Sequence, residues 1–140
     1  MPVPVEYKRA SMDFEQFMLD AREISGLATT HQTYTMVQAV FQAFRRRLDV
    51  KEAIGFANVL PPVLRALFVA DWDLDEPRRP FEDRAIMTRE VQSLRPDHNF
   101  APPSSIRDVA AALRKNIDQA ALNRVLTGLP PGAVAFWQVD

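Results

Sequence analysis

Hydrophobic residues recur every three or four positions along most of the chain, and this spacing is typical of one face of an α-helix. Three such stripes stand out. They comprise Phe14, Phe17, Met18, Ala21 and Ile24; Val37, Val40, Phe41, Phe44 and Leu48; and Ile106, Val109, Ala110, Leu113 and Ile117. No stretch alternates between apolar and polar residues in the manner of a half-buried strand. The pattern therefore predicts an all-α fold.

Residues with capping chemistry lie at the ends of these stripes. Asp13, with Gln16 three residues on, is the expected N-cap of the first helix, and Gly26 is its expected C-cap. Asp49 and Glu52 have the spacing of a capping box and predict the start of a third helix. Further helix starts are expected at Ser105, with Asp108 three residues on, and at Asp118.

The triplet Leu-Pro-Pro occurs twice, at residues 60–62 and 129–131. Proline breaks a helix interior because it lacks an N–H and clashes with the preceding turn, but it suits the first turn of a new helix. Each triplet is therefore expected to end one helix and to open a short second one. Leu60 and Leu129 are expected to be buried at these two junctions.

The chain also matches itself. Residues 14–31 align with 81–98 at an offset of 67, and residues 37–68 align with 106–137 at an offset of 69. The identical pairs keep their order along the chain, and they include His31/His98, Arg45/Arg114 and Asp49/Asp118. Separate matches in one order indicate a tandem duplication.

The duplication predicts one domain over residues 1–140, with two repeats of about four helices each at residues 13–70 and 80–138. Residues 71–79 are the expected linker between them. A repeat of about 55 residues buries little apolar surface alone, so the repeats are expected to pack into one helical bundle-like domain with a shared core. The opening dozen residues are expected to form a loosely held arm.

The doubled unit, the segment FRRRLDVKEAIGFANVLPPVLRALF and the tryptophan soon after it resemble the bacterial family of unknown function numbered 2267. The resemblance covers the chain from about Phe14 to Trp137. It implies an all-helical fold with internal duplication and a bacterial source. The family has no established activity, so the resemblance assigns no catalytic or binding residue. The second repeat departs from the pattern by carrying Gly132 after its prolines and two extra loop residues.

Charge and composition exclude several classes of function. Basic and acidic residues number 17 and 18, so the chain lacks the basic surface of a nucleic-acid-binding protein. The one basic run, Arg45–Arg47, closes a predicted helix and is expected to be solvated. Without cysteine there are no disulfides, thiolate metal sites or cysteine nucleophiles. No run reaches the roughly 18 apolar residues of a membrane span, and no export signal is visible, so a soluble cytoplasmic protein is expected.

Motifs for enzyme chemistry are missing. The sequence contains no glycine-rich phosphate loop, zinc-protease motif or nucleophile elbow, so we expect no cofactor and favour a protein that is not an enzyme. One alternative is a metal-binding protein or metal-dependent enzyme that uses His31 and His98 with Glu23 and Glu90, because imidazole and carboxylate bind divalent metals. No pair among them has the helical spacing of a bundle metal site. We favour the interpretation in which the histidines pack or cap loops and the glutamates are solvated.

The aromatic residues are read as structural. Phe41, Phe44, Phe56 and Phe68 have helical spacing and are expected in the core. Trp72 and Trp137 follow the fourth helix of each repeat, where a tryptophan typically seals a core edge and donates its N–H to a loop carbonyl. Stacking on a ligand is the alternative.

The missing catalytic motifs and the duplicated helical body together favour a non-enzymatic module. Such a module would bind a protein partner or self-associate as a homo-oligomer, since grooves between helical units suit another helix.

Overall fold

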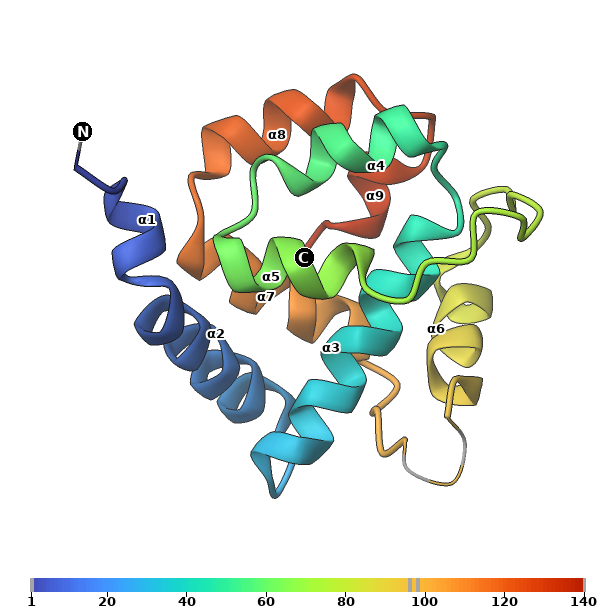
Figure 1. Ribbon diagram of the computed structural model, residues 1–140. Coiled ribbons are helices and arrows are strands. Elements are labelled where there is room, and N and C mark those ends of the chain that lie inside the picture. The colour runs from blue at the N-terminus through green and yellow to red at the C-terminus, as the bar shows by residue number, and fades with distance from the viewer. Residues whose placement is uncertain (1, 96, 98, 140) are drawn as a thin grey trace.

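The computed structural model describes residues 2–95, 97 and 99–139, and every regular element within them is a helix. Nine helices occur in this part of the chain (Figure 1). They are α1 (Val5–Lys8), α2 (Ala10–Ser25), α3 (Thr30–Arg45), α4 (Val50–Ala57), α5 (Pro62–Val69), α6 (Arg84–Ser93), α7 (Ser105–Asn116), α8 (Gln119–Thr127) and α9 (Ala133–Phe136). The predicted all-α class is confirmed. Within the described ranges, no helix combines the length and apolar character needed to cross a membrane.

The first long helix begins earlier than predicted. Asp13 is not its N-cap: α2 starts at Ala10, and the Asp13 N–H already donates to the Arg9 carbonyl at 2.9 Å. Asp13 instead forms an ion pair with Arg9 one turn before it, at 3.6 Å. The segment that was expected to be a loosely held arm contains the short helix α1, none of whose residues is buried.

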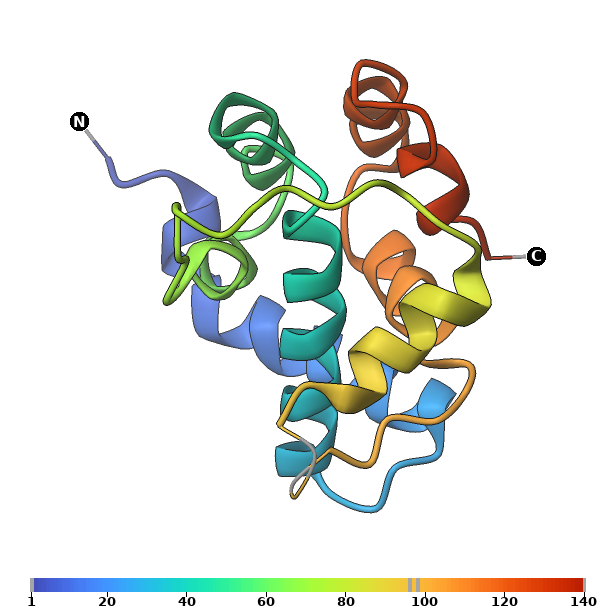
Figure 2. The ribbon, with the colours of Figure 1, turned by 90° about the vertical axis from the view of Figure 1, so that its right-hand side faces the viewer.

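Helices from the first half of the chain pack against helices from the second half. Helix α2 packs along α7, and α3 packs against α6, which crosses it in Figure 2. Helix α3 also contacts α7, so α2, α3, α6 and α7 surround a common interior. The buried apolar residues of both halves belong to one hydrophobic cluster.

The central helix α3 supplies the middle of this core. The residues of its predicted stripe are buried as expected, with Val37, Val40, Phe41 and Phe44 in α3 and Leu48 three residues beyond its end, each at most 4% exposed. The ring of Phe44 lies 4.8 Å from that of Phe56, 4.9 Å from that of Phe136 and 5.3 Å from that of Trp137. Trp137 is fully buried, but its Nε1 has no hydrogen-bond partner among the described residues. The expected N–H bond to a loop carbonyl is therefore wrong for Trp137. Its ring packs against several phenylalanine rings, which offer no strong hydrogen-bond acceptor.

Local capping chemistry fixes most of the other helix ends. The Asp49 side chain accepts from the Glu52 N–H at 2.8 Å, and the Glu52 side chain accepts from the Asp49 N–H at 2.8 Å, which confirms the capping box. Asp118 caps α8 as predicted. Gly26 ends α2 with a φ of 75°, as expected of a left-handed C-cap.

The predicted start of α7 is displaced by one residue. Ser104 is its N-cap, and Ser105 lies inside the helix, where it is fully buried. The Ser104 hydroxyl donates to the Asp108 carboxylate at 2.7 Å and caps no backbone N–H. Sequence patterns locate helix ends only to within a residue or two.

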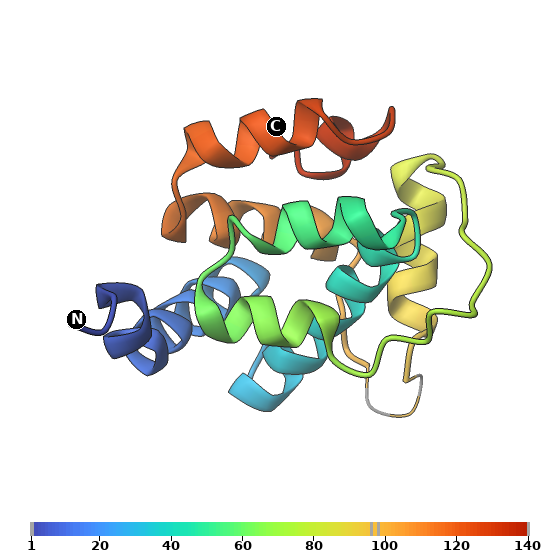
Figure 3. The ribbon, with the colours of Figure 1, turned by 45° about the horizontal axis from the view of Figure 1, so that its top comes forward.

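The two Leu-Pro-Pro triplets occupy similar places but differ in detail. Pro61 is the N-cap of α5 and Pro62 its first residue, so the first junction is confirmed. In the second, Gly132 follows the prolines as the N-cap of α9. The helices that precede the triplets, α4 and α8, lie next to each other (Figure 3). Leu60 is buried as expected, whereas Leu129 is only half-buried, so the expectation was wrong there.

Residues matched at the offset of 69 make matched contacts. Arg45 donates to the Phe68 carbonyl at 2.9 Å, and Arg114 donates to the Trp137 carbonyl at 2.9 Å. The connection between the halves runs from α5 to α6, over residues 70–83. The tandem duplication remains a prediction, and these equivalent contacts support it.

Candidate functional site

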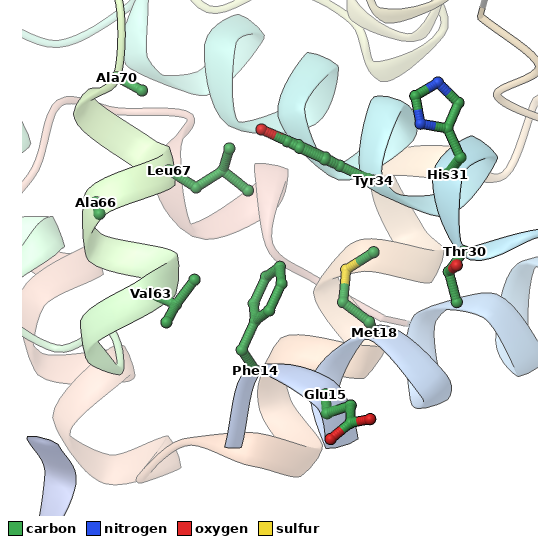
Figure 4. A pocket seen from close by; sticks show the side chains of 10 residues that line it. All are labelled: Phe14, Glu15, Met18, Thr30, His31, Tyr34, Val63, Ala66, Leu67 and Ala70. Atoms are coloured by element: carbon green, nitrogen blue, oxygen red, sulfur yellow. The ribbon is translucent and has the colours of Figure 1, made fainter. Parts of the chain in front are cut away.

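An open groove lies between α2, α3 and α5 and has a volume of about 730 Å³. Phe14 and Met18 project into it from α2, and Leu67 projects into it from α5 (Figure 4). Tyr34 extends from α3 toward Leu67 (Figure 4). The centre of the groove is therefore apolar.

The groove owes its apolar wall to α5, which has two apolar faces. Leu64 and Phe68 are fully buried in the core. Residues at helical spacing on a second face line the groove, and these are Val63, Ala66, Leu67 and Ala70. The two alanines have short side chains and therefore fill little of the groove. Sequence reasoning missed the groove, although the run PVLRALFVA, apolar except for Arg65, was the available signal.

Polar side chains gather along one edge of the groove. Glu15 of α2 and Thr30 and His31 of α3 lie there (Figure 4). All three are exposed. His31 does not cap α3, because Thr29 and Gln32 form the capping box at that end. The edge offers hydrogen-bonding groups and one carboxylate beside an apolar centre.

The structure separates the described members of the predicted metal set. His31 lies at the groove, and Glu23 is exposed on α2. Glu90 of α6 is instead engaged by the guanidinium groups of Arg46, Arg47 and Arg79. Among the residues that the structure describes, no group of three or more His, Asp or Glu side chains could hold a metal ion. His98 lies outside the described residues, so the complete set remains untested.

The basic run at the end of α3 is not a solvated helix end, contrary to prediction. Arg45 and Arg47 are 5% and 1% exposed. Arg47 pairs with Glu90 at 3.0 Å and with Glu82 at 3.3 Å, and Arg46 pairs with Glu90 at 3.4 Å. The expectation that Glu90 is solvated was also wrong, because its side chain is 9% exposed. The acids that pair with Arg46 and Arg47 lie in the second half of the chain, which explains why local sequence did not reveal these ion pairs.

The charge of this cluster sets the protonation of Glu90. Burial alone would raise the pKa of its carboxyl, but the hydrogen bond and charge of Arg47 act in the opposite direction. The charges of Arg79 and Arg46 add to that effect, and the pKa of Glu90 is held below its ordinary value. The cluster is a buried ion-pair network that joins α3 to α6.

The matching family model is that of the uncharacterised conserved proteins called DUF2267, and it covers residues 14–136. The chain belongs to the DUF2267 family. The resemblance noted from the sequence is thereby confirmed. No curated protein matches the chain. The family description names no activity for DUF2267 proteins.

The family match includes the groove of this DUF2267 protein but not the first residues of the chain. Every residue that lines the groove, from Phe14 to Ala70, lies inside the matched range. Helix α1 and the first turn of α2 precede that range. The matched range thus contains the whole lining of the groove, and the exposed helix α1 lies outside it.

Proposed function

We propose that this protein is a non-enzymatic interaction module that associates with a second copy of itself. In each copy the groove between α2, α3 and α5 receives the arm, defined as residues 2–9, of the other copy. One observation carries the proposal: a single chain presents both an open apolar groove and an apolar arm with exposed side chains.

The groove has the character of an interaction surface. Phe14, Val63 and Leu67 are only partly buried, although each packs against the core or lines the groove. An apolar patch of this kind, rimmed by polar residues, marks a site of association more often than inert surface. A space between three helices suits a segment that inserts side chains at regular intervals.

The arm has apolar side chains with little to contact in its own molecule. Val3, Val5 and Tyr7 are 54%, 67% and 50% exposed. Pro2 and Pro4 restrict the backbone around them, which lowers the entropy lost when the arm is ordered by binding. Transfer of these side chains into an apolar groove would remove them from water.

Charge and position fit an exchange of arms between two copies. Lys8 lies at the end of α1, and Glu15 lies on the polar edge of the groove, so the arm carries a cation and the groove edge carries a carboxylate of opposite charge. Phe14 comes one helical turn after the start of α2, so the arm leaves the body beside the groove. Two copies related by a two-fold axis would each contribute one arm and one groove.

Sedimentation velocity of the untagged protein at concentrations up to about 200 μM tests the proposal. We expect a dimer. Val5→Asp in the arm and Ala66→Glu in the groove change exposed residues, so both variants should fold, and both should sediment as monomers. An equimolar mixture of the two variants keeps one intact arm–groove contact and should associate to an intermediate extent.

A charge placed on another exposed apolar position provides the control. Ile54 of α4 is 51% exposed and does not line the groove, so Ile54→Glu should leave the dimer intact. A wild-type protein that remains monomeric over the whole concentration range would overturn the proposal. A dimer that persists in Ala66→Glu would also overturn it, because association would then use another surface.

A further inference from the structure

A second, smaller cavity of about 240 Å³ lies where the end of α3 and the start of α4 meet the segment after α5. Arg45 and Trp72 line it, and the guanidinium carbon of Arg45 lies 5.3 Å from the centre of the Trp72 ring. Trp72 is half-buried, so one part of its ring contacts the core and another lines the cavity.

Arg45 is a buried cation whose hydrogen bonds are incomplete. It is 5% exposed, and both of its hydrogen bonds come from Nη1, to the carbonyls of Phe68 at 2.9 Å and Ala70 at 3.0 Å. Its Nε is buried and has no partner within the described part of the chain. The edge formed by Nε and Nη2 is the one that binds a carboxylate or phosphate with two parallel hydrogen bonds.

The matched residue in the second half of the chain shows how such an arginine is satisfied by the fold itself. Arg114 lies at the equivalent place on α7, and its Nε donates to the Trp137 carbonyl at 2.9 Å. Its Nη1 donates to the Asn123 side chain at 3.1 Å. A buried donor without a partner is costly, and more so when it is charged. Burial lowers the pKa of Arg45, which reflects this cost.

Other charges around the cavity leave a positive balance. Arg46 and Arg78 line it with Arg45, and the acids are Glu76 and Asp49. Glu76 already pairs with the Arg46 Nε at 2.9 Å, and Asp49 is committed to capping α4. Arg78 is 57% exposed and touches Glu52 only at 3.6 Å, so it is available to an incoming anion.

We infer that this cavity binds a small organic anion. Its carboxylate or phosphate head would pair with the guanidinium group of Arg45 and with Arg78. Its body would lie against the side chains of Trp72 and Leu74, which form an apolar part of the cavity wall. The site is separate from the groove proposed for self-association, and it can be tested independently of it.

Phenyl phosphate, benzoate and inorganic phosphate are suitable probes, titrated at constant ionic strength with sodium chloride. The readout is the ¹H–¹⁵N spectrum of the arginine Nε–H and tryptophan indole groups. We expect saturable shifts of the Arg45 Nε–H and Trp72 indole signals with at least one of the two organic anions. The signals of Arg114 and Trp137 should not move. A tighter response to phenyl phosphate or to benzoate identifies the head group.

Substitutions separate binding from general salt effects. Arg45→Lys keeps the charge but removes the two-donor edge and should weaken binding at least about tenfold, whereas Arg114→Lys should not. If Arg45→Lys fails to fold, the exposed Arg78→Gln substitution should still weaken binding severalfold. Absence of saturable shifts with both organic anions would overturn the inference. Equal affinity of wild type and a folded Arg45→Lys protein, or of wild type and Arg78→Gln, would also overturn it.

Discussion

Arg47, in the turn that follows α3, holds the carboxylate of Glu90 of α6 through two hydrogen bonds, from Nη1 to Oε2 at 3.1 Å and from Nη2 to Oε1 at 3.0 Å. The same guanidinium donates to the carbonyls of Ala43 and Pro80. The Arg47 side chain is 0% exposed, and its charge is compensated almost wholly by residues from the other half of the chain. This pair therefore ties the two halves together at the edge of the core.

Replacement of Arg47 should be strongly destabilising. Arg47→Met preserves most of the volume but leaves Glu90 without its main partner in a buried place. Loss of one member of a buried ion pair typically costs about 3–5 kcal/mol. Urea denaturation should show a loss of that size, whereas Arg89→Met, at an exposed position of α6 next to Glu90, should change stability by less than about 0.5 kcal/mol. Equal urea midpoints for Arg47→Met and Arg89→Met would mean that the Arg47–Glu90 ion pair contributes little to the free energy of unfolding.

The Glu90 carboxylate should make stability depend on acid pH. Its pKa is lower in the folded protein than its ordinary value of 4.5, so its contribution is complete above that value and is lost as the pH falls through the folded pKa. Glu90→Gln should therefore be less stable than wild type at pH 7, and the difference should shrink below about pH 4.5. Glu23→Gln, at the matched exposed position of α2, is the control for thermal melts across this range.

Asp108 should act with the opposite sign. It is 3% exposed, and burial raises its pKa despite the hydrogen bond from Ser104 and the charge of Arg107. The folded state then binds more protons than the unfolded state, and stability falls as the pH rises through the folded pKa. Asp108→Asn keeps an acceptor for Ser104 and removes the buried charge. Its melting temperature relative to wild type should increase from pH 4 to pH 8, and a constant difference would contradict this prediction.

The two leucines that precede the proline pairs should differ in their contribution to stability. Leu60 is 1% exposed, and Leu60→Ala should cost about 2–5 kcal/mol because it leaves a cavity in the core. Leu129 is half-buried, so Leu129→Ala should cost less than half as much. Thermal and urea unfolding of the two variants decide this. Two melts close to wild type would indicate that the first triplet is a surface feature instead of a helix junction.

Sequence predicted those parts of the fold that depend on neighbours within one helical turn. The stripe from Val37 to Leu48 is buried, and Asp49 and Glu52 cap each other, because both features arise from spacing along the helix. The burial of Arg45 and Arg47 could not be predicted in this way. Arg46 and Arg47 pair with Glu76 and Glu82 of the α5–α6 connection and with Glu90 of α6. Arg45 is held by the carbonyls of Phe68 and Ala70, so the contacts of all three arginines depend on parts of the chain far away in sequence.

The candidate groove illustrates the same limit. The sequence of α5 shows apolar residues on nearly every side, but it does not say which side the rest of the protein leaves uncovered. Packing of Leu64 and Phe68 into the core decides that Val63 and Leu67 face outward. Similarly, sequence could place Trp137 in the core but could not show that its buried N–H would find no hydrogen-bond partner among the described residues.

Gly132 and Gly55 should respond in opposite ways to alanine. Gly132 has a φ of 104°, and an added Cβ would meet the Cβ and Cγ of Phe81 at 2.5 and 2.6 Å. Gly132→Ala should therefore cost at least about 2 kcal/mol, from the strained backbone and from displacement of the ring. Gly55 lies inside α4 with open space around its Cα, so Gly55→Ala should stabilise the protein by up to about 1 kcal/mol through helix propensity. Urea midpoints that move in the same direction for both variants would show that the contact between Gly132 and Phe81 does not constrain the start of α9.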